Sequence, residues 1–396
     1  MNRSRSFGRG VITASVLFLG ILGSPVARAQ GPSPNVTVFA TGLNNPRGLK
    51  FGPDGSLYVA EGGAAGDLST VGTCAQVPGP VGPYTGGFTA RISKIDTNGN
   101  RTTVADNLPS SQTSPNLGKL VSGVADVAFI GNTLYALTSG SGCSHGLANT
   151  TNAILRIHSD GAWNMVADLS AFQKSHPVVH PEPDDFEPDG TWYSMVSVRG
   201  QLYAVEPNHG ELDVVSTDGT IRRIADISAA EGHIVPTSVA YHGNFYVGNL
   251  NTFPIQDGSS KILKITPSGQ IQTVVTGLTT VLGVAFDHEG FMYILENTTG
   301  GNSFPTPFTG KVLRVTDNGL QEIASGLFLP TAMTFGPDGA LYVSNVGFGP
   351  PPVGMGQVVR ITVSSRSWGI RGTVIPLPLR DDRACFSLAP YPCGLN

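Results

Sequence analysis

Six polar residues occupy the same place in six related stretches of the chain, directly after a short apolar run that contains a tyrosine. They are Glu61, Thr138, Glu206, Asn249, Glu296 and Asn345. Carboxylate and amide oxygens are the ligands that Ca²⁺ or Mg²⁺ prefers. If these side chains face a common axis, all six could bind a polar ligand there. A divalent cation would use Glu61, Glu206, Glu296, Asn249 and Asn345. The alternative is that they cap the loop backbone and bind water.

Histidines offer a second kind of chemistry. Five of the eight histidines fall in loops that we expect on the same side of the molecule: His145, His176, His180, His209 and His233. Imidazoles near carboxylates can ligate a transition metal or act as a general base. No H-E-x-x-H spacing is present, so we expect solvated loop histidines. The acidic stretch 182–190 lacks the calcium-loop pattern and is likewise expected to be a solvated, proline-stiffened loop.

The elements that must position these residues form a repeat. The stretch 46–59 recurs at 330–343 with nine of its fourteen residues identical, and looser copies lie at 122–137, 193–205, 236–247 and 282–295. Each copy has an apolar run, a tight turn with glycine, and a strand with a central tyrosine. Six copies recur about every 57 residues, and self-similarity at a fixed period indicates a repeat architecture.

Each copy continues with a third apolar strand, a turn such as Asn98-Gly99 or Asp160-Gly161, and a fourth strand. Asx-Gly pairs between apolar runs indicate hairpins, because glycine adopts positive φ without strain. The sequence therefore predicts an all-β fold, a six-bladed β-propeller over residues 30–363 with four antiparallel strands per blade. The sixth copy stops after its third strand, near Val363. Residues 36–43 resemble a fourth strand, so the N-terminal strand is expected to close the ring.

Long connections are predicted on one face only. They follow the second strand of five copies, at 61–89, 138–151, 249–260, 296–310 and 345–356, and one long connection between copies lies at 169–190. The turns at the other end are short. Because binding and catalytic residues concentrate on loops held by a rigid scaffold, the loop-rich face is the expected functional face.

The two ends of the chain are distinct from the repeat. Residues 1–29 have a basic start, an apolar run of about a dozen residues and an A-x-A site, which is typical of a secretory signal peptide. Residues 364–396 break the repeat and are expected to form an irregular or disordered tail. Export implies an oxidising compartment, secreted or periplasmic. Of the three pairings that four cysteines allow, we expect Cys74–Cys143, in equivalent loops of adjacent repeats, and Cys385–Cys393.

The composition and charge of the chain limit the classes of partner that it can bind. The net charge is −4 and only 13% of residues are charged, against about 25% in an average soluble protein. A nucleic-acid-binding surface needs a positive excess, so nucleic acid is not expected as a partner. No later segment is long and apolar enough to span a membrane after signal cleavage. We expect a monomer that binds a small molecule or an exported or cell-surface protein.

The chain resembles the ScyD/ScyE family, exported propeller proteins named for scytonemin pigment clusters. The resemblance rests on TGLNNPRGL (41–49), DGSLYVAE (54–61), LPTA (329–332) and DGALYVSN (338–345), and it covers residues 36–363. It implies a six-bladed, TolB-like propeller outside the cytoplasm. Similar phrases occur in NHL-repeat proteins and in gluconolactonase-like hydrolases. The resemblance implies no set of catalytic residues.

Three functions follow as hypotheses. The first is a secreted ligand-binding or accessory propeller, because no nucleophile–base pair is recognisable in the sequence. The second is a divalent-metal-dependent hydrolase of the gluconolactonase/SMP-30 kind, with Ca²⁺ or Mg²⁺ on the five oxygen donors. The third is a quinone-dependent sugar dehydrogenase with His145 or His209 as the base, although the sequence shows no basic quinone-binding cluster on the loop-rich face. Fold alone does not choose among them.

Overall fold

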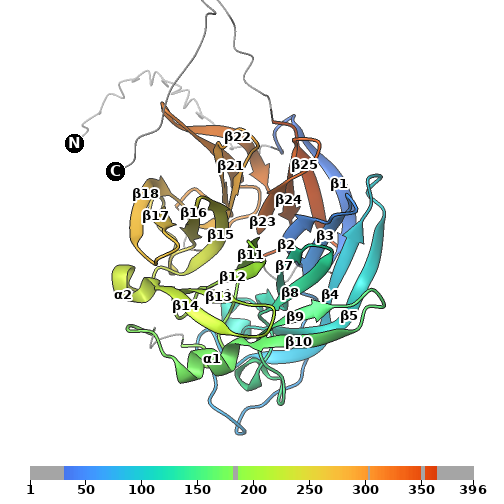
Figure 1. Ribbon diagram of the computed structural model, residues 1–396, viewed down its shortest axis with the longest axis vertical. Coiled ribbons are helices and arrows are strands. Elements are labelled where there is room, and N and C mark those ends of the chain that lie inside the picture. Colours follow the sequence, from blue (N-terminus) through green and yellow to red (C-terminus); the bar gives the residue numbers. More distant parts are fainter. Residues whose placement is uncertain (1–30, 182–185, 302–303, 349–352, 364–396) are drawn as a thin grey trace, which may run out of the picture. The chain divides into compact units, whose positions relative to one another are not determined.

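The computed structural model describes residues 31–181, 186–301, 304–348 and 353–363. Their strands form six antiparallel sheets arranged as the blades of a ring (Figure 1). This confirms the six-bladed β-propeller predicted from the repeat. The predicted signal peptide (1–29), the predicted tail (364–396) and the predicted Cys385–Cys393 disulfide lie outside the described residues.

The first three blades follow one another along the chain, each starting with its innermost strand. Blade 1 contains β2 (Pro46–Phe51), β3 (Leu57–Glu61), β4 (Thr85–Ile95), β5 (Arg101–Gln112) and the two-residue β6 (Val121–Ser122). Blade 2 contains β7 (Val124–Ile130), β8 (Thr133–Thr138), β9 (Ala153–Ile157) and β10 (Trp163–Asp168). Blade 3 contains β11 (Ser194–Val198), β12 (Gln201–Glu206), β13 (Glu211–Val215) and β14 (Ile221–Asp226).

The last three blades complete and close the ring. Blade 4 contains β15 (Pro236–His242), β16 (Asn244–Asn249), β17 (Ser260–Ile265) and β18 (Ile271–Leu278). Blade 5 contains β19 (Val281–Phe286), β20 (Met292–Glu296), β21 (Gly310–Thr316) and β22 (Gly319–Leu327). Blade 6 contains β23 (Ala332–Phe335), β24 (Leu341–Asn345) and β25 (Gly356–Ile361), with the N-terminal β1 (Val36–Leu43) outermost. Figure 1 shows β1 beside β25, so the N-terminal strand closes the ring as predicted, and the register pairs Val36 with Ile361.

Burial explains why these sequences form blades. The inner strands are covered on both faces by neighbouring blades, so β24 is buried along its whole length. The outermost strands are covered less, and the first four residues of β22 are exposed. The turn between β2 and β3 shows the local signal: the Asp54 side chain accepts a hydrogen bond from the Ser56 amide (3.1 Å), and Gly55 adopts φ of 77°.

The connections between strands differ from the prediction in two respects. Two short helices, α1 (Leu169–Ser175) and α2 (Ile227–Glu231), follow β10 and β14, and one-turn 3₁₀ helices cover Pro115–Leu117 and Cys143–His145. The side chains of Asp168 and Asp226 cap α1 and α2 by accepting hydrogen bonds from the amides of Ala171 and Ala229. A second long connection, at 113–120, joins blades 1 and 2, because β5 continues further than its apolar core predicts.

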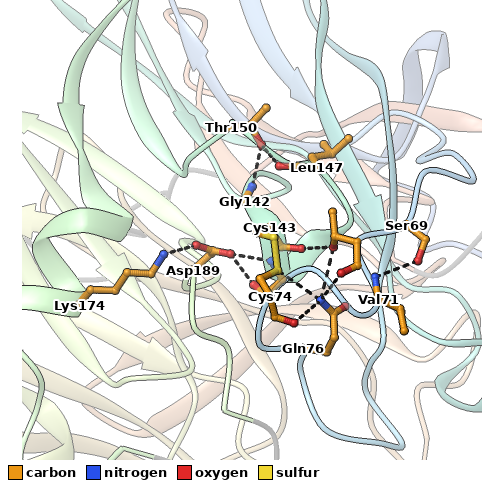
Figure 2. Close-up of a disulfide and its surroundings, with 12 residues drawn as sticks. Ser69, Val71, Cys74, Gln76, Gly142, Cys143, Leu147, Thr150, Lys174 and Asp189 are labelled. Carbon is orange, nitrogen blue, oxygen red and sulfur yellow. Dashed lines mark hydrogen bonds and ion pairs between the residues drawn. A yellow bond between two sulfur atoms is a disulfide. The ribbon is translucent and has the colours of Figure 1, made fainter.

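The predicted Cys74–Cys143 disulfide is confirmed, and it joins loops of blades 1 and 2 (Figure 2). A disulfide is compatible with a protein that works outside the cytoplasm. Within the described part of the chain, none of the helices has the length and apolar character needed to cross a bilayer.

Candidate functional site

The six predicted site residues lie at the ends of equivalent strands on the loop-rich side of the ring. Each ends the second strand of its blade, and each is buried, with the largest exposed fraction 7%, at Asn345. Their side chains bind their own blades. Three carboxylates each accept a backbone amide from the connection that enters the blade: Asn44 N to Glu61 Oε2 (2.6 Å), Thr191 N to Glu206 Oε1 (2.7 Å) and Thr279 N to Glu296 Oε1 (2.6 Å).

The side chains of the two asparagines, Asn249 and Asn345, also form hydrogen bonds with the backbone of the connections that enter their blades. Asn249 donates from Nδ2 to the carbonyl of Ile234 (2.9 Å), and the amide of Phe328 donates to Asn345 Oδ1 (2.9 Å). Thr138 instead exchanges hydrogen bonds with the backbone of Ala153 on the next strand. In all six cases the polar side chain fixes a loop or strand of its own blade, which is the capping arrangement.

The residues present do not fit a shared Ca²⁺ or Mg²⁺ site. Glu61 is paired with Arg91 (2.8 Å), and Glu296 lies 3.3 Å from Lys311 Nζ. In the described ranges, no three His, Cys, Asp or Glu side chains converge as metal ligands. The reason is geometric: strand side chains point to the two faces of a sheet, which in a propeller meet the neighbouring blades rather than the axis.

A cavity of about 570 Å³ lies instead at the mouth of the axis on the loop-rich side. Its walls come from the starts of the innermost strands and from loops of five blades, while blade 5 contributes only Leu282 of β19. Residues that directly follow three of the predicted positions line it, namely Ser139, Pro207 and Leu250. Five aromatic side chains also line it: Tyr84, Trp192, Tyr193, Phe253 and Phe348. This size and lining are typical of a site for a drug-sized, ring-containing ligand.

Arg47 supplies the positive charge of the cavity wall. It lies on β2, and its guanidinium donates a hydrogen bond to the carbonyl of Val121. Among the residues that the structure describes, no carboxylate lies within 4.0 Å of this guanidinium. A guanidinium without a carboxylate partner in a partly apolar cavity favours a ligand that carries a carboxylate, sulfonate or phosphate group.

Tyr193 lies beside Arg47 and stays neutral at ordinary pH. Burial raises the pKa of Tyr193 to about 12, although the neighbouring Arg47 acts in the opposite direction. Its hydroxyl donates to the carbonyl of Thr331 (2.9 Å). Trp192, the preceding residue, is fully buried, and its indole N–H has no acceptor among the described residues. Near Arg47 the cavity wall therefore has more hydrogen-bond donors than acceptors.

Glu187, a buried acid of the cavity wall, contacts Tyr84 of the wall and two buried histidines, His145 and His209, that do not line the cavity. Glu187 accepts a hydrogen bond from the hydroxyl of Tyr84 (2.8 Å), and its other oxygen lies 3.3 Å from His145 Nε2. The Tyr84 and His145 rings meet edge to face at 4.7 Å between centroids. His209 Nε2 lies 3.0 Å from the carbonyl oxygen of Glu187. The carboxylate of Glu187 and the phenol of Tyr84 line the cavity and could transfer a proton to or from a ligand, with His145 behind the carboxylate.

These positions correct two expectations from the sequence. His145 and His209 are 0% and 5% exposed, not solvated, whereas His176 and His180 are exposed as expected. The described part of the acidic stretch is also buried at Glu187 and Asp189. These residues can be buried because two neighbouring loops supply hydrogen-bond partners for their polar groups. The Glu187 amide donates to Asn208 Oδ1 (2.8 Å), and Asp189 accepts from the Ser144 amide.

Asp189 and the disulfide fasten together loops of blades 1 and 2 and the connection between blades 2 and 3 (Figure 2). Asp189 accepts hydrogen bonds from the amide and hydroxyl of Ser144, and its other oxygen lies 2.6 Å from Lys174 Nζ. Burial alone would raise the pKa of Asp189, but Lys174 and Ser144 hold it below its usual value. The residue before Ser144, Cys143, is bonded to Cys74 of the blade 1 loop. The loops that carry Tyr84, His145 and Glu187 are thus linked covalently and by charge.

Comparison with known proteins supports the fold. No model of a protein family matches the chain, and no curated protein matches it. Three solved structures are similar: a putative oxidoreductase (glucose dehydrogenase) from Thermus thermophilus (16% identity, 83% of this chain and 99% of that chain, TM-score 0.53), a glucose dehydrogenase (12%, 84% and 100%, 0.50) and a luciferin-regenerating enzyme (11%, 84% and 96%, 0.50). At these identities the similarity shows a shared six-bladed propeller fold and nothing finer.

Sequence reasoning missed the residues that line the cavity. Arg47 lies within the strongest repeat motif, where the equivalent residue of the last copy is Thr331. The sequence marks Arg47 as special only because an arginine occurs at this position in one of these two copies. Tyr84 and Glu187 come from long loops without any repeat. The signal that could have marked Glu187 is the unusual density of acids and prolines in 182–190, which we interpreted as a solvated loop.

Proposed function

We propose that the chain is a secreted binding propeller of the ScyD/ScyE kind, which holds a small ring-containing anion in the axial cavity. The observation that carries the proposal is Arg47, whose guanidinium lines an aromatic cavity and has no carboxylate within 4.0 Å in the described ranges. The anionic group of the ligand takes the place of that partner. The aromatic walls cover its rings.

Binding of 1-anilinonaphthalene-8-sulfonate, an aromatic sulfonate that fluoresces in apolar surroundings, tests this proposal. We expect saturable binding to one site per chain. Arg47→Gln weakens it about tenfold, which corresponds to the loss of about 1.4 kcal/mol from one charged hydrogen bond. Arg47→Lys keeps the charge and loses less. Arg222→Gln, on the exposed side of β14, is the matched control. Equal affinity in the wild type and Arg47→Gln contradicts the proposal.

A second candidate is catalysis in the same cavity, in line with the hydrolase alternative. The observation that favours it is the buried Glu187 carboxylate between Tyr84 and His145. A general base of this kind would need no metal, and Glu187→Gln would abolish turnover while leaving sulfonate binding intact. A divalent-metal mechanism on Glu61, Glu206 and Glu296 predicts instead a stoichiometric cation that is lost on Glu206→Ala, which metal analysis of the purified protein detects.

A further inference from the structure

A second cavity, of about 580 Å³, lies on the same side of the ring between the long loops of blades 5 and 6. Its walls are aliphatic and aromatic, with Phe308, Phe328 and Met355 among them. The polar side chains that line it in the described ranges are Asn345 and Gln357. Asn345 Oδ1 accepts a hydrogen bond from the backbone amide of Phe328, and Asn345 Nδ2 lies 3.4 Å from Gln357 Oε1. The cavity therefore offers a ligand no charge and few hydrogen-bonding groups.

The loops around this cavity expose large apolar side chains to water. Phe304, Phe308 and Met355 have exposed fractions of 42%, 48% and 53%. The sequence has no charged residue in 297–310 or in 346–359. Clusters of exposed apolar side chains are rare on soluble proteins unless something covers them. The uncharged loops favour a hydrocarbon as the covering group.

The second cavity adjoins the axial cavity. Leu120 and Phe348 line both cavities. In addition, Phe253 of the axial cavity stacks on Phe304 of the second one, with ring centroids 5.4 Å apart and an angle of 28° between the rings. The boundary that these side chains form is apolar, so a hydrocarbon chain can pass it without leaving a polar group unpaired.

We propose that the two cavities bind one elongated amphiphile, a fatty carboxylate. Its carboxylate pairs with Arg47, and its chain passes Leu120 and Phe348 into the second cavity. This inference rests on the proposed function and names the ligand class of the same site. It differs from a compact ring compound in one respect: affinity grows with chain length beyond what the axial cavity buries. Each buried methylene tightens binding up to about fourfold.

Isothermal titration of the full chain with octanoate and tetradecanoate, each below its micelle concentration, tests the inference. We expect one site, and at least tenfold tighter binding of tetradecanoate. Phe308→Asp places a carboxylate in the wall of the second cavity. Phe308 is exposed and has φ of 65°, a conformation that Asp tolerates, so this variant should fold. It should lower tetradecanoate affinity at least tenfold and leave octanoate affinity unchanged.

Phe88→Asp is the matched control, because Phe88 is an equally exposed phenylalanine (47%) that lines neither cavity. A tetradecanoate affinity that equals that of octanoate, or that Phe88→Asp lowers as much as Phe308→Asp, overturns the inference. If anilinonaphthalene sulfonate still binds in an Arg47-dependent way, the proposed function survives that result. If neither the sulfonate nor any carboxylate binds, the proposed function fails as well.

Discussion

Tyr193 donates its hydroxyl to the carbonyl oxygen of Thr331 at 2.9 Å, and this bond joins blade 3 to blade 6 across the axis. Tyr193 precedes β11 and Thr331 precedes β23, on opposite sides of a six-membered ring. The hydroxyl of Thr331 donates in turn to the carbonyl of Pro46, on the strand that carries Arg47. These two hydrogen bonds therefore link blades 3, 6 and 1 beside the axial cavity, whose wall includes Tyr193 and Arg47.

Tyr193→Phe removes the bridge and keeps the ring. We expect the free energy of unfolding to fall by about 1 kcal/mol, because a net hydrogen bond is worth that much and the Thr331 carbonyl loses its partner. Urea unfolding measures it. Tyr58→Phe is the control, since the Tyr58 hydroxyl bonds Asp54 at an exposed turn and its loss should cost less than about 0.5 kcal/mol. Equal effects of the two variants would show that the bridge does not stabilise the ring.

Asp213, on β13, should make stability depend on pH. Its side chain is fully buried and neither oxygen has a hydrogen-bond partner among the described residues. Burial, and then the nearby Glu211, raise the pKa of Asp213 well above its usual value. A carboxyl whose pKa is raised by folding contributes its full stability below the unfolded pKa of about 4, and that stability is lost as the pH rises through the folded pKa.

Asp213→Asn should therefore stabilise the chain by on the order of 1 kcal/mol or more at pH 8, and by less at pH 4. Thermal unfolding across this range measures the difference between variant and wild type. Asp160→Asn, at an exposed turn, serves as the control. A stability difference that does not grow from pH 4 to pH 8 would show that Asp213 ionises freely in the folded chain.

The Cys74–Cys143 disulfide should support both stability and the cavity. It closes a loop between residues 69 apart in sequence, for which the chain-entropy model gives about 4 kcal/mol. The double variant Cys74→Ser with Cys143→Ser should lower the free energy of unfolding by up to that amount. Because the bridged loops carry Tyr84 and His145, it should also weaken sulfonate binding. Unchanged urea midpoint and unchanged affinity would contradict both roles.

A chelator should leave the fold unchanged. Glu61, Glu206 and Glu296 hold loops of their own blades through backbone amides, so their arrangement does not depend on a cation. We expect the same melting temperature with and without excess EDTA. A drop of several degrees, reversed by Ca²⁺ but not by Na⁺, would support a metal site and the hydrolase alternative.

The sequence predicts the scaffold well and the site poorly, for a physical reason. Blade strands such as β3 and β24 repeat because every blade meets the same packing and turn requirements, so the period reveals them. The ring position of Glu61 and its equivalents was predictable for the same reason. The direction of those side chains was not, because it depends on which face of the sheet each residue takes. The cavity residues Arg47, Tyr84 and Glu187 differ from blade to blade and meet only in three dimensions.

The central claim is that the axial cavity holds an anion at Arg47. A crystal structure of the chain soaked with 1-anilinonaphthalene-8-sulfonate tests it most directly. The account predicts electron density for the rings among Tyr84, Trp192 and Phe253, with a sulfonate oxygen within hydrogen-bond distance of the Arg47 guanidinium. Density for the compound on the outer strands, with only water in the cavity, would contradict it.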